Sequence, residues 1–227
     1  MNEEKTTSDL VPLDRLAGWL DEQGLENGAP IRDLAALAGG SQNAVFRFAR
    51  GNRDFVLRRP RRDARVTANA AIRRETELLA ALSATDVPHP RLVAACPDEG
   101  VLGTCFYLME PIDGWSPGSP LIEPFASSPA LQREMGFAFV DAAAALGSVD
   151  YIAAGLEGFG KPEGFLERQV GRWRTQLDGY RKIEGYDGRE LPNLERVSRW
   201  LEAERPRTEQ DSAGNAAELD ANRRLFS

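Results

Sequence analysis

The sequence predicts an α+β protein of two lobes, in which strands and one helix come first and helices alone follow. Three observations support this prediction. Residues 31–111 contain short alternating apolar segments typical of strands, residues 115–125 form a proline-rich connection, and residues 129–206 contain three segments with helical periodicity. A chain of 227 residues is long enough to give two small lobes an apolar core.

The composition is that of a globular protein outside the membrane. Hydrophobic residues make up 42% and charged residues 28% of the chain, and no apolar run is long enough to cross a bilayer. The first residues are acidic and polar, unlike a signal or transit peptide. Cys96 and Cys105 are too few for a disulfide framework. We therefore expect a cytoplasmic protein with reduced thiols and no membrane contact.

The net charge of −7 conceals a basic block. Between Arg47 and Arg74 there are ten arginines against two acids, Asp54 and Asp63. Such a block fits either a solvated basic face or a surface that holds anionic groups of a ligand. Aromatic residues are not interleaved with the arginines, and the rest of the chain is acidic, so we expect no nucleic-acid binding.

We divide the chain into four segments. Residues 1–9 are polar and expected to be disordered. Residues 10–112 form the strand-rich lobe, and residues 113–206 form a partial helical lobe. Residues 207–227 are polar almost to the end and are expected to be a disordered tail.

The strand-rich lobe begins with a helix over 11–23, ended by Gly24. Residues 31–38 combine helix-favouring composition with strand-like alternation before a double glycine, and we predict a strand. Gly51-Asn52 forms a tight turn between strands over 44–50 and 54–59. A helix without Gly or Pro covers 67–83, and strands follow at 91–96 and 103–111.

The helical lobe begins with a strongly apolar helix over 129–146, which should be buried on most sides. Two further helices, over 162–183 and 191–206, each have one apolar face. We predict that Trp173 and Trp200 belong to the core.

The helix over 67–83 carries an acid on its apolar face. Positions i, i+3, i+7 and i+10 are occupied by Ile72, Glu75, Leu79 and Leu82. A carboxylate on a buried face is costly unless it meets a cation. In the strand over 54–59, Arg58 lies on one face and Arg59 on the other, and Arg58 is the candidate partner. Alternatively, Glu75 lies at the edge of the stripe and is partly hydrated.

Two further segments are candidates for ligand contacts. The turn Gly39-Gly40-Ser41-Gln42-Asn43 between two strands would let backbone N–H groups approach an anion. Most Gly-Gly turns are only hairpins, and no Walker pattern follows. The strand that runs into Glu110-Pro111 could equally be a core strand leaving its sheet.

In this order, the three signals resemble the amino-terminal lobe of a kinase. The segments GGSQNAVFRF, FVLRRP, TDVPHPRLVAAC, GTCFYLMEPIDG and GFLERQVGRW resemble the aminoglycoside-phosphotransferase family. Within that family they are most similar to the kinase-like domains associated with acyl-CoA dehydrogenases. The resemblance covers residues 10–206. It implies a protein-kinase-like fold, with an antiparallel sheet in the first lobe and helices in the second.

The resemblance also implies a site for ATP. Its adenine would contact Val56, Met109 as the gatekeeper, and the backbone of Glu110 and Ile112. Its phosphates would lie against Gly40, Ser41, Asn43 and Arg58. Arg58 stands where kinases have a lysine, and Glu75 stands where they have the helix carboxylate that pairs with it. Arginine in place of lysine is a departure, because its charge has a different reach and geometry.

The family activity is ATP-dependent phosphoryl transfer to a hydroxyl of a small molecule, and the acyl-CoA dehydrogenase connection favours a hydroxyacyl-CoA over an antibiotic. Members carry His-Gly-Asp, then Asn, then an Asp that holds Mg²⁺. Here the one histidine is His89, in VPHP, and Asp211 and Asn215 are too closely spaced. We therefore expect a chain that stops, or shifts frame, before its catalytic segment. Its rival is a short nucleotide-binding or partner-binding module, with apolar helix surface left exposed for a partner chain.

Overall fold

The computed structural model divides into two compact units, residues 1–142 and residues 143–227. It describes residues 10–37, 43–61, 67–115, 120–161, 163–186, 188 and 191–205. The predicted disordered ends, 1–9 and 207–227, lie outside these residues. Among the helices of the described segments, none has the length and apolar character needed to cross a membrane.

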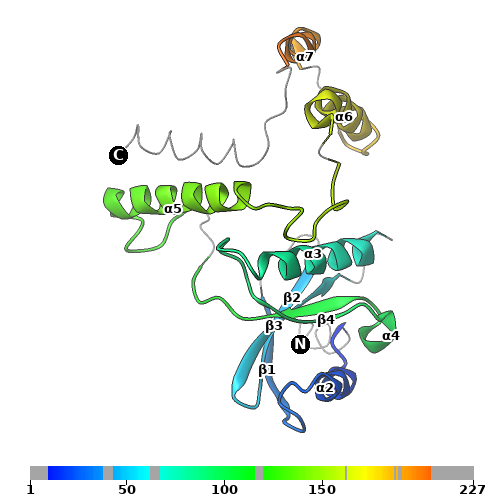
Figure 1. Cartoon of the computed structure of the whole chain (residues 1–227), viewed down its shortest axis with the longest axis vertical. Coiled ribbons are helices and arrows are strands. Elements are labelled where there is room, and N and C mark those ends of the chain that lie inside the picture. Colours follow the sequence, from blue (N-terminus) through cyan, green and yellow to red (C-terminus); the bar gives the residue numbers. More distant parts are fainter. Residues whose placement is uncertain are drawn as a thin grey trace. The chain divides into compact units, whose positions relative to one another are not determined.

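The first unit is built on a five-stranded antiparallel sheet (Figure 1). Its strands are β1 (Ile31–Leu37), β2 (Asn43–Arg50), β3 (Arg53–Pro60), β4 (Leu92–Cys96) and β5 (Phe106–Met109). They lie in the order β1-β2-β3-β5-β4. All five strand predictions are confirmed, including the segment 31–38, for which helix and strand signals competed.

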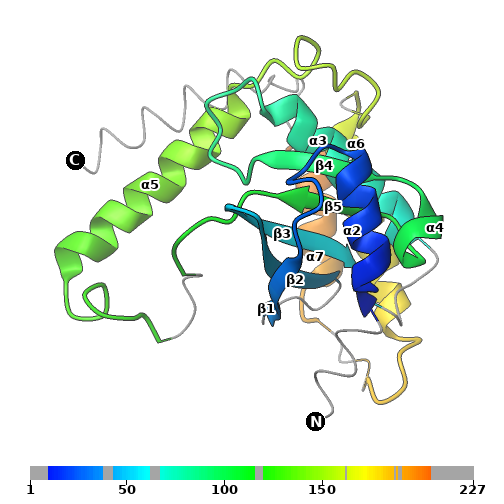
Figure 2. The same cartoon turned by 90° about the horizontal axis from the view of Figure 1, so that it is seen from below.

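A helix covers each face of the sheet (Figures 1 and 2). The helix α2 (Leu13–Glu22) packs with Phe46, Phe55 and Leu108 in the larger core cluster. The helix α3 (Ala68–Leu82) contributes Ile72 to the smaller cluster on the other face, where β5 supplies Tyr107. Alternation along β5 places Phe106 and Leu108 in the larger cluster and Tyr107 in the smaller one, because successive side chains of a strand point to opposite faces.

Polar contacts fix α3 at its first turns. The Oδ1 atom of Asn69 accepts hydrogen bonds from the Thr104 hydroxyl and, at 3.1 Å, from the Cys105 N–H. Arg73 donates to a carboxylate oxygen of Glu99 at 3.0 Å. Glu99 begins α4 (Glu99–Leu102), a short helix that the sequence did not predict and whose cap is the side chain of Asp98. These contacts tie α3 to the segment that leads into β5.

The basic block is divided between the two faces of the sheet. Arg50 and Arg59 are buried on the α2 face. Arg50 donates to the Ala17 carbonyl at 3.0 Å and pairs with Asp21, while Arg59 donates to the Leu102 carbonyl at 3.2 Å. The block is therefore neither one solvated face nor one ligand surface.

The helices after residue 128 are α5 (Pro129–Gly147), α6 (Phe165–Tyr180) and α7 (Leu194–Ala203). The predicted helices are confirmed, but their predicted burial is wrong. No residue of α5 is buried, and its Phe139 is 76% exposed. Trp173 and Trp200 are 62% and 60% exposed. The separate expectation of exposed apolar surface on these helices is confirmed.

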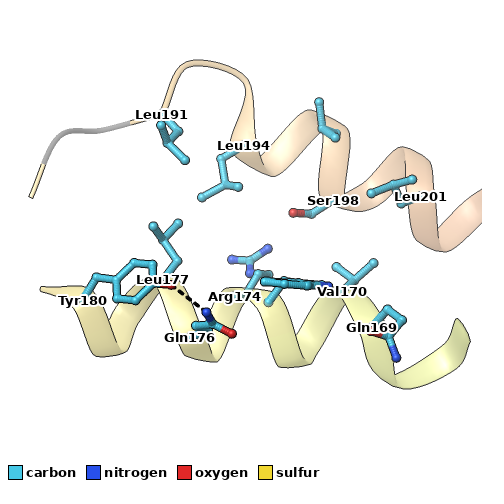
Figure 3. A pocket seen from close by; sticks show the side chains of 12 residues that line it. Gln169, Val170, Arg174, Gln176, Leu177, Tyr180, Leu191, Leu194, Ser198 and Leu201 are labelled. Atoms are coloured by element: carbon cyan, nitrogen blue, oxygen red, sulfur yellow. Dashed lines mark hydrogen bonds between the residues drawn. The ribbon is translucent and has the colours of Figure 1, made fainter. Parts of the chain in front are cut away.

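In the second unit, α6 and α7 form a pair around a groove of about 490 Å³ (Figure 3). Leu177 of α6 and Leu194 of α7 point into the space between the helices. The two helices are also joined by a two-pronged ion pair, in which Arg174 donates to the carboxylate oxygens of Glu195 at 3.0 and 2.5 Å. This contact raises the pKa of Arg174 and lowers the pKa of Glu195, mainly through its hydrogen bonds.

The docking of α3 is tested by Ile72→Ala. Ile72 is 1% exposed, so truncation leaves a cavity under the helix and should reduce the free energy of unfolding by about 2–5 kcal/mol. The matched control is Glu77→Ala on the exposed side of the same helix, expected to change it by less than about 0.5 kcal/mol. Urea denaturation measures both. Equal effects of the two substitutions would contradict the packing described.

Candidate active site

The centre of the candidate site is an ion pair between β3 and α3. The Nε atom of Arg58 lies 3.0 Å from Oε2 of Glu75, and Nη2 of Arg58 donates to Oε1 at 3.1 Å. The side chains are 35% and 33% exposed, so the pair is half-buried. The predicted pairing of Glu75 with Arg58 is confirmed. Glu75 is also partly exposed to water, as the alternative expected. Glu77, which lies off this apolar stripe, is exposed.

A third group completes the pair. The hydroxyl of Tyr107 donates to Oε2 of Glu75 at 3.1 Å, and Tyr107 is only 3% exposed. Burial raises the pKa of the phenol well above its usual range; the positive charge of Arg58 opposes the rise, and Glu75 adds to it. The hydroxyl therefore remains a donor over the physiological pH range. Tyr107 was missed in the sequence, because the register of β5 against β3 that places it beside Arg58 is not visible there.

Strand register places the other predicted residues in two rows across the sheet. In one row, Arg58 lies between Val45 of β2 and Tyr107 of β5. In the next row, Val56 pairs with Met109, and Met109 pairs with Leu92 of β4. The predicted adenine contacts Val56 and Met109 are thus neighbours on the α3 face. Each lies two residues along its strand from the pair formed by Arg58 and Tyr107.

The segment after β5 supplies the backbone groups that were predicted to bind adenine. The N–H of Glu110 donates to the Arg91 carbonyl at 2.9 Å, so the carbonyl is the Glu110 backbone group that remains to face a ligand. Ile112 is 67% exposed. Next to it, Asp113 lies 4.0 Å from Arg47, which also pairs with Asp54 at 2.6 Å. Arg47 thus links the sheet to Asp113, in the segment that follows β5.

The glycine turn is described only at its end. Asn43 is half-buried at the first position of β2 and pairs with Pro60. Gly40 and Ser41 lie outside the described residues. Among the residues that the structure describes, no three His, Cys, Asp or Glu side chains are grouped so that they could hold a metal ion.

Comparison with known proteins identifies the family. Residues 33–214 match the model of the "Phosphotransferase enzyme family". The chain belongs to the phosphotransferase enzyme family. This match includes all of β2 to β5, most of β1, the Arg58–Glu75 pair and the helices α5 to α7.

The curated relatives are much longer proteins. The chain is 30% identical to acyl-CoA dehydrogenase family member 10 of Mus musculus over 87% of its own length and 18% of the relative. It is 30% identical to acyl-CoA dehydrogenase family member 11 of Homo sapiens over 74% of the chain and 20% of that protein. The chain thus spans about a fifth of the length of the curated relatives it matches.

A solved structure shows the same fold. It is a crystal structure from Ralstonia eutropha, provisionally described as an aminoglycoside phosphotransferase, with a TM-score of 0.68 and 28% sequence identity. The match covers 87% of this chain and 55% of the solved one. The prediction of a kinase-like α+β fold related to the aminoglycoside phosphotransferases is confirmed.

The raised pKa of Tyr107 predicts a loss of stability in alkali. The folded chain retains the phenolic proton at pH values where the unfolded chain, with a pKa of about 10, releases it. The stabilising contribution is therefore complete below pH 10 and falls as the pH rises further. Between pH 9 and 11, wild type should lose stability more steeply than Tyr107→Phe. Urea midpoints measured over this range for both proteins test this, and parallel curves would contradict it.

Proposed function

We propose that this chain is the nucleotide-binding part of a phosphotransferase that transfers the γ-phosphoryl group of ATP to a small-molecule hydroxyl. The Arg58–Glu75 pair is the observation that carries the proposal. Kinases keep a cation on a central strand for the nucleotide phosphates and a helix carboxylate that holds this cation in place. Here both groups occupy that arrangement, with two contacts of 3.0 and 3.1 Å between them.

The apolar neighbours of this pair suit an adenine ring. Val56 and Met109 are paired on the same face of the sheet and present side chains without charge. The Glu110 carbonyl would accept a hydrogen bond from the adenine amino group, and the Ile112 N–H would donate to the ring. A planar base held by two backbone groups and an apolar floor is the usual design of such a site. Gly40, Ser41 and Asn43 are proposed to lie against the phosphates.

Arg58 would act on the nucleotide as a permanent positive charge. Its guanidinium offers several N–H donors in one plane, which match phosphate oxygens as well as carboxylates. Glu75 keeps the guanidinium beside α3 and prevents it from extending along the sheet. ATP supplies the phosphoryl group, and the residues of this chain bind and orient it.

The chemical step of the family requires groups that we do not find in this sequence. His89 is followed by Pro90, so the chain contains no His-Gly-Asp. The part of the chain that the structure describes also offers no cluster of acids that fits Mg²⁺. We therefore assign nucleotide binding to this chain and derive no metal-dependent step from it. We further propose a cytoplasmic location, in keeping with two buried, unpaired cysteines.

The names of the relatives support a proposal for the acceptor class. Mouse, human and plant proteins that share 30–33% identity with this chain are named as acyl-CoA dehydrogenases or members of that family. We propose a hydroxyacyl-CoA-type acceptor, an anionic small molecule.

The second candidate function is binding of a partner chain. It is favoured by the exposed apolar side chains of the later helices, above all Phe139, Trp173 and Trp200.

Nucleotide binding is tested with Arg58→Ala. Removing a cation from the phosphates should weaken ATP binding on the order of tenfold, while adenosine, which has no phosphate, should bind as before. Arg58→Lys keeps the charge but loses the two-pronged contact with Glu75, so its Kd for ATP should lie between those of wild type and Arg58→Ala. The control is Arg53→Ala, an exposed arginine on the same strand but on the opposite face. Calorimetry measures each Kd. Unchanged ATP binding by Arg58→Ala would contradict the assignment.

Phosphoryl transfer is tested separately. Purified chain with ATP, Mg²⁺ and a panel of 3- and 4-hydroxyacyl-CoAs should form no phosphorylated product above the rate without protein, since no general base in the required motif is present. Mass spectrometry of the acyl-CoA pool provides the measurement. Product that depends on the chain and is lost in Arg58→Ala would show instead that the chain completes the reaction.

A further inference from the structure

The hydroxyl of Tyr107 has no role that the packing of the sheet explains. Phe106 and Leu108, its neighbours in β5, fill the α2 face, while Tyr107 and Met109 fill the α3 face. A phenylalanine ring would fill the same apolar space beside Ile72. A buried phenol needs a hydrogen-bond partner for its O–H, and here the partner is an atom of Glu75 that is already used by Arg58.

Strand register explains why the two donors converge. Arg58 and Tyr107 are directly paired across β3 and β5, so their side chains rise next to each other on the same face. Glu75 on α3 lies over both. Its Oε2 accepts from Tyr107 at 3.1 Å and lies 3.0 Å from Arg58 Nε, while Oε1 accepts from Arg58 Nη2 at 3.1 Å.

The geometry of these contacts limits the carboxylate to one orientation. A two-pronged pair with a guanidinium requires the carboxylate and guanidinium planes to be aligned. Glu75 has a flexible side chain that is one-third exposed, so the ion pair by itself competes with water for this alignment. A third bond, from a rigid aromatic side chain that is almost wholly buried, fixes Oε2 relative to the sheet.

We propose that Tyr107 is a positioning residue of the nucleotide site, which acts through Glu75 to hold the Arg58 guanidinium where ATP phosphates bind. The inference rests on the proposed function of Arg58. The raised pKa of the phenol keeps the donor proton in place at the pH of binding. Tyr107 itself touches no nucleotide in this proposal.

The experiment compares ATP with adenosine as ligands of wild type and Tyr107→Phe. Loss of the hydroxyl should weaken ATP binding on the order of fivefold and leave adenosine binding within about twofold, because only the phosphates depend on Arg58. In a Glu75→Ala background, Tyr107→Phe should have no further effect on ATP binding, since Tyr107 acts through that carboxylate. Tyr151→Phe, at an exposed tyrosine, is the control for loss of a phenolic hydroxyl.

A measurement without nucleotide accompanies the titrations. The Nε–H resonance of Arg58 is identified by its absence in Arg58→Lys, and in Tyr107→Phe it should shift and exchange faster with water. An unchanged Nε–H resonance, or equal loss of ATP and adenosine affinity, would overturn the proposal and leave Tyr107 with a packing role alone. If wild type binds no ATP, the proposed function fails and the nucleotide role of Tyr107 fails with it. The resonance then decides separately whether Tyr107 holds the ion pair.

Discussion

The ion pair between Glu75 and Arg58 is the contact on which the first unit depends. It is the point where the apolar face of α3 contains a charge, and there the sheet presents a cation to it. The other polar anchors of α3, at Asn69 and Arg73, reach the residues just before β5 and the start of α4. The helix is thus tied to β3 and to the approach to β5. Val56 and Met109 lie on these same two strands, and the register of β3 against β5 places them next to the cation.

Much of this arrangement could be predicted from the sequence, because it follows from the periods of helices and strands. Glu75 falls on the stripe of Ile72 and Leu79 at helical spacing, and alternation in β3 puts Arg58 on one face and Arg59 on the other. Tyr107 could not be found in this way. Apolar residues occupy both faces of FYLM, and nothing in the pattern tells an aromatic ring that only packs from one whose hydroxyl has a partner. That distinction requires the register of β3 against β5, a contact between residues 49 positions apart in the chain.

For the helices after residue 128, the apolar composition predicted burial that the structure does not show. An apolar helix has a tendency to be buried, but burial requires another surface, which a sequence pattern does not supply. The pattern therefore predicted α5 correctly as a helix and wrongly as a buried one. In α6 and α7, leucine side chains meet across the groove, while Trp173 and Trp200 remain largely exposed. The family match includes these helices, so they are part of the phosphotransferase fold and not an unrelated addition.

The arginines of the basic block have different partners on the two faces of the sheet. On the α2 face, Arg50 donates to a backbone carbonyl and pairs with Asp21, and Arg59 donates to a backbone carbonyl. Both guanidinium groups are therefore bound by groups of the protein itself. On the α3 face, Arg47 pairs with Asp54 and Arg58 with Glu75. Of these four arginines, Arg58 is the one whose carboxylate partner also accepts a hydrogen bond from a buried phenol, that of Tyr107. Arg50 and Arg59 are buried, so of these four arginines an anionic ligand could reach only Arg47 and Arg58, both on the α3 face.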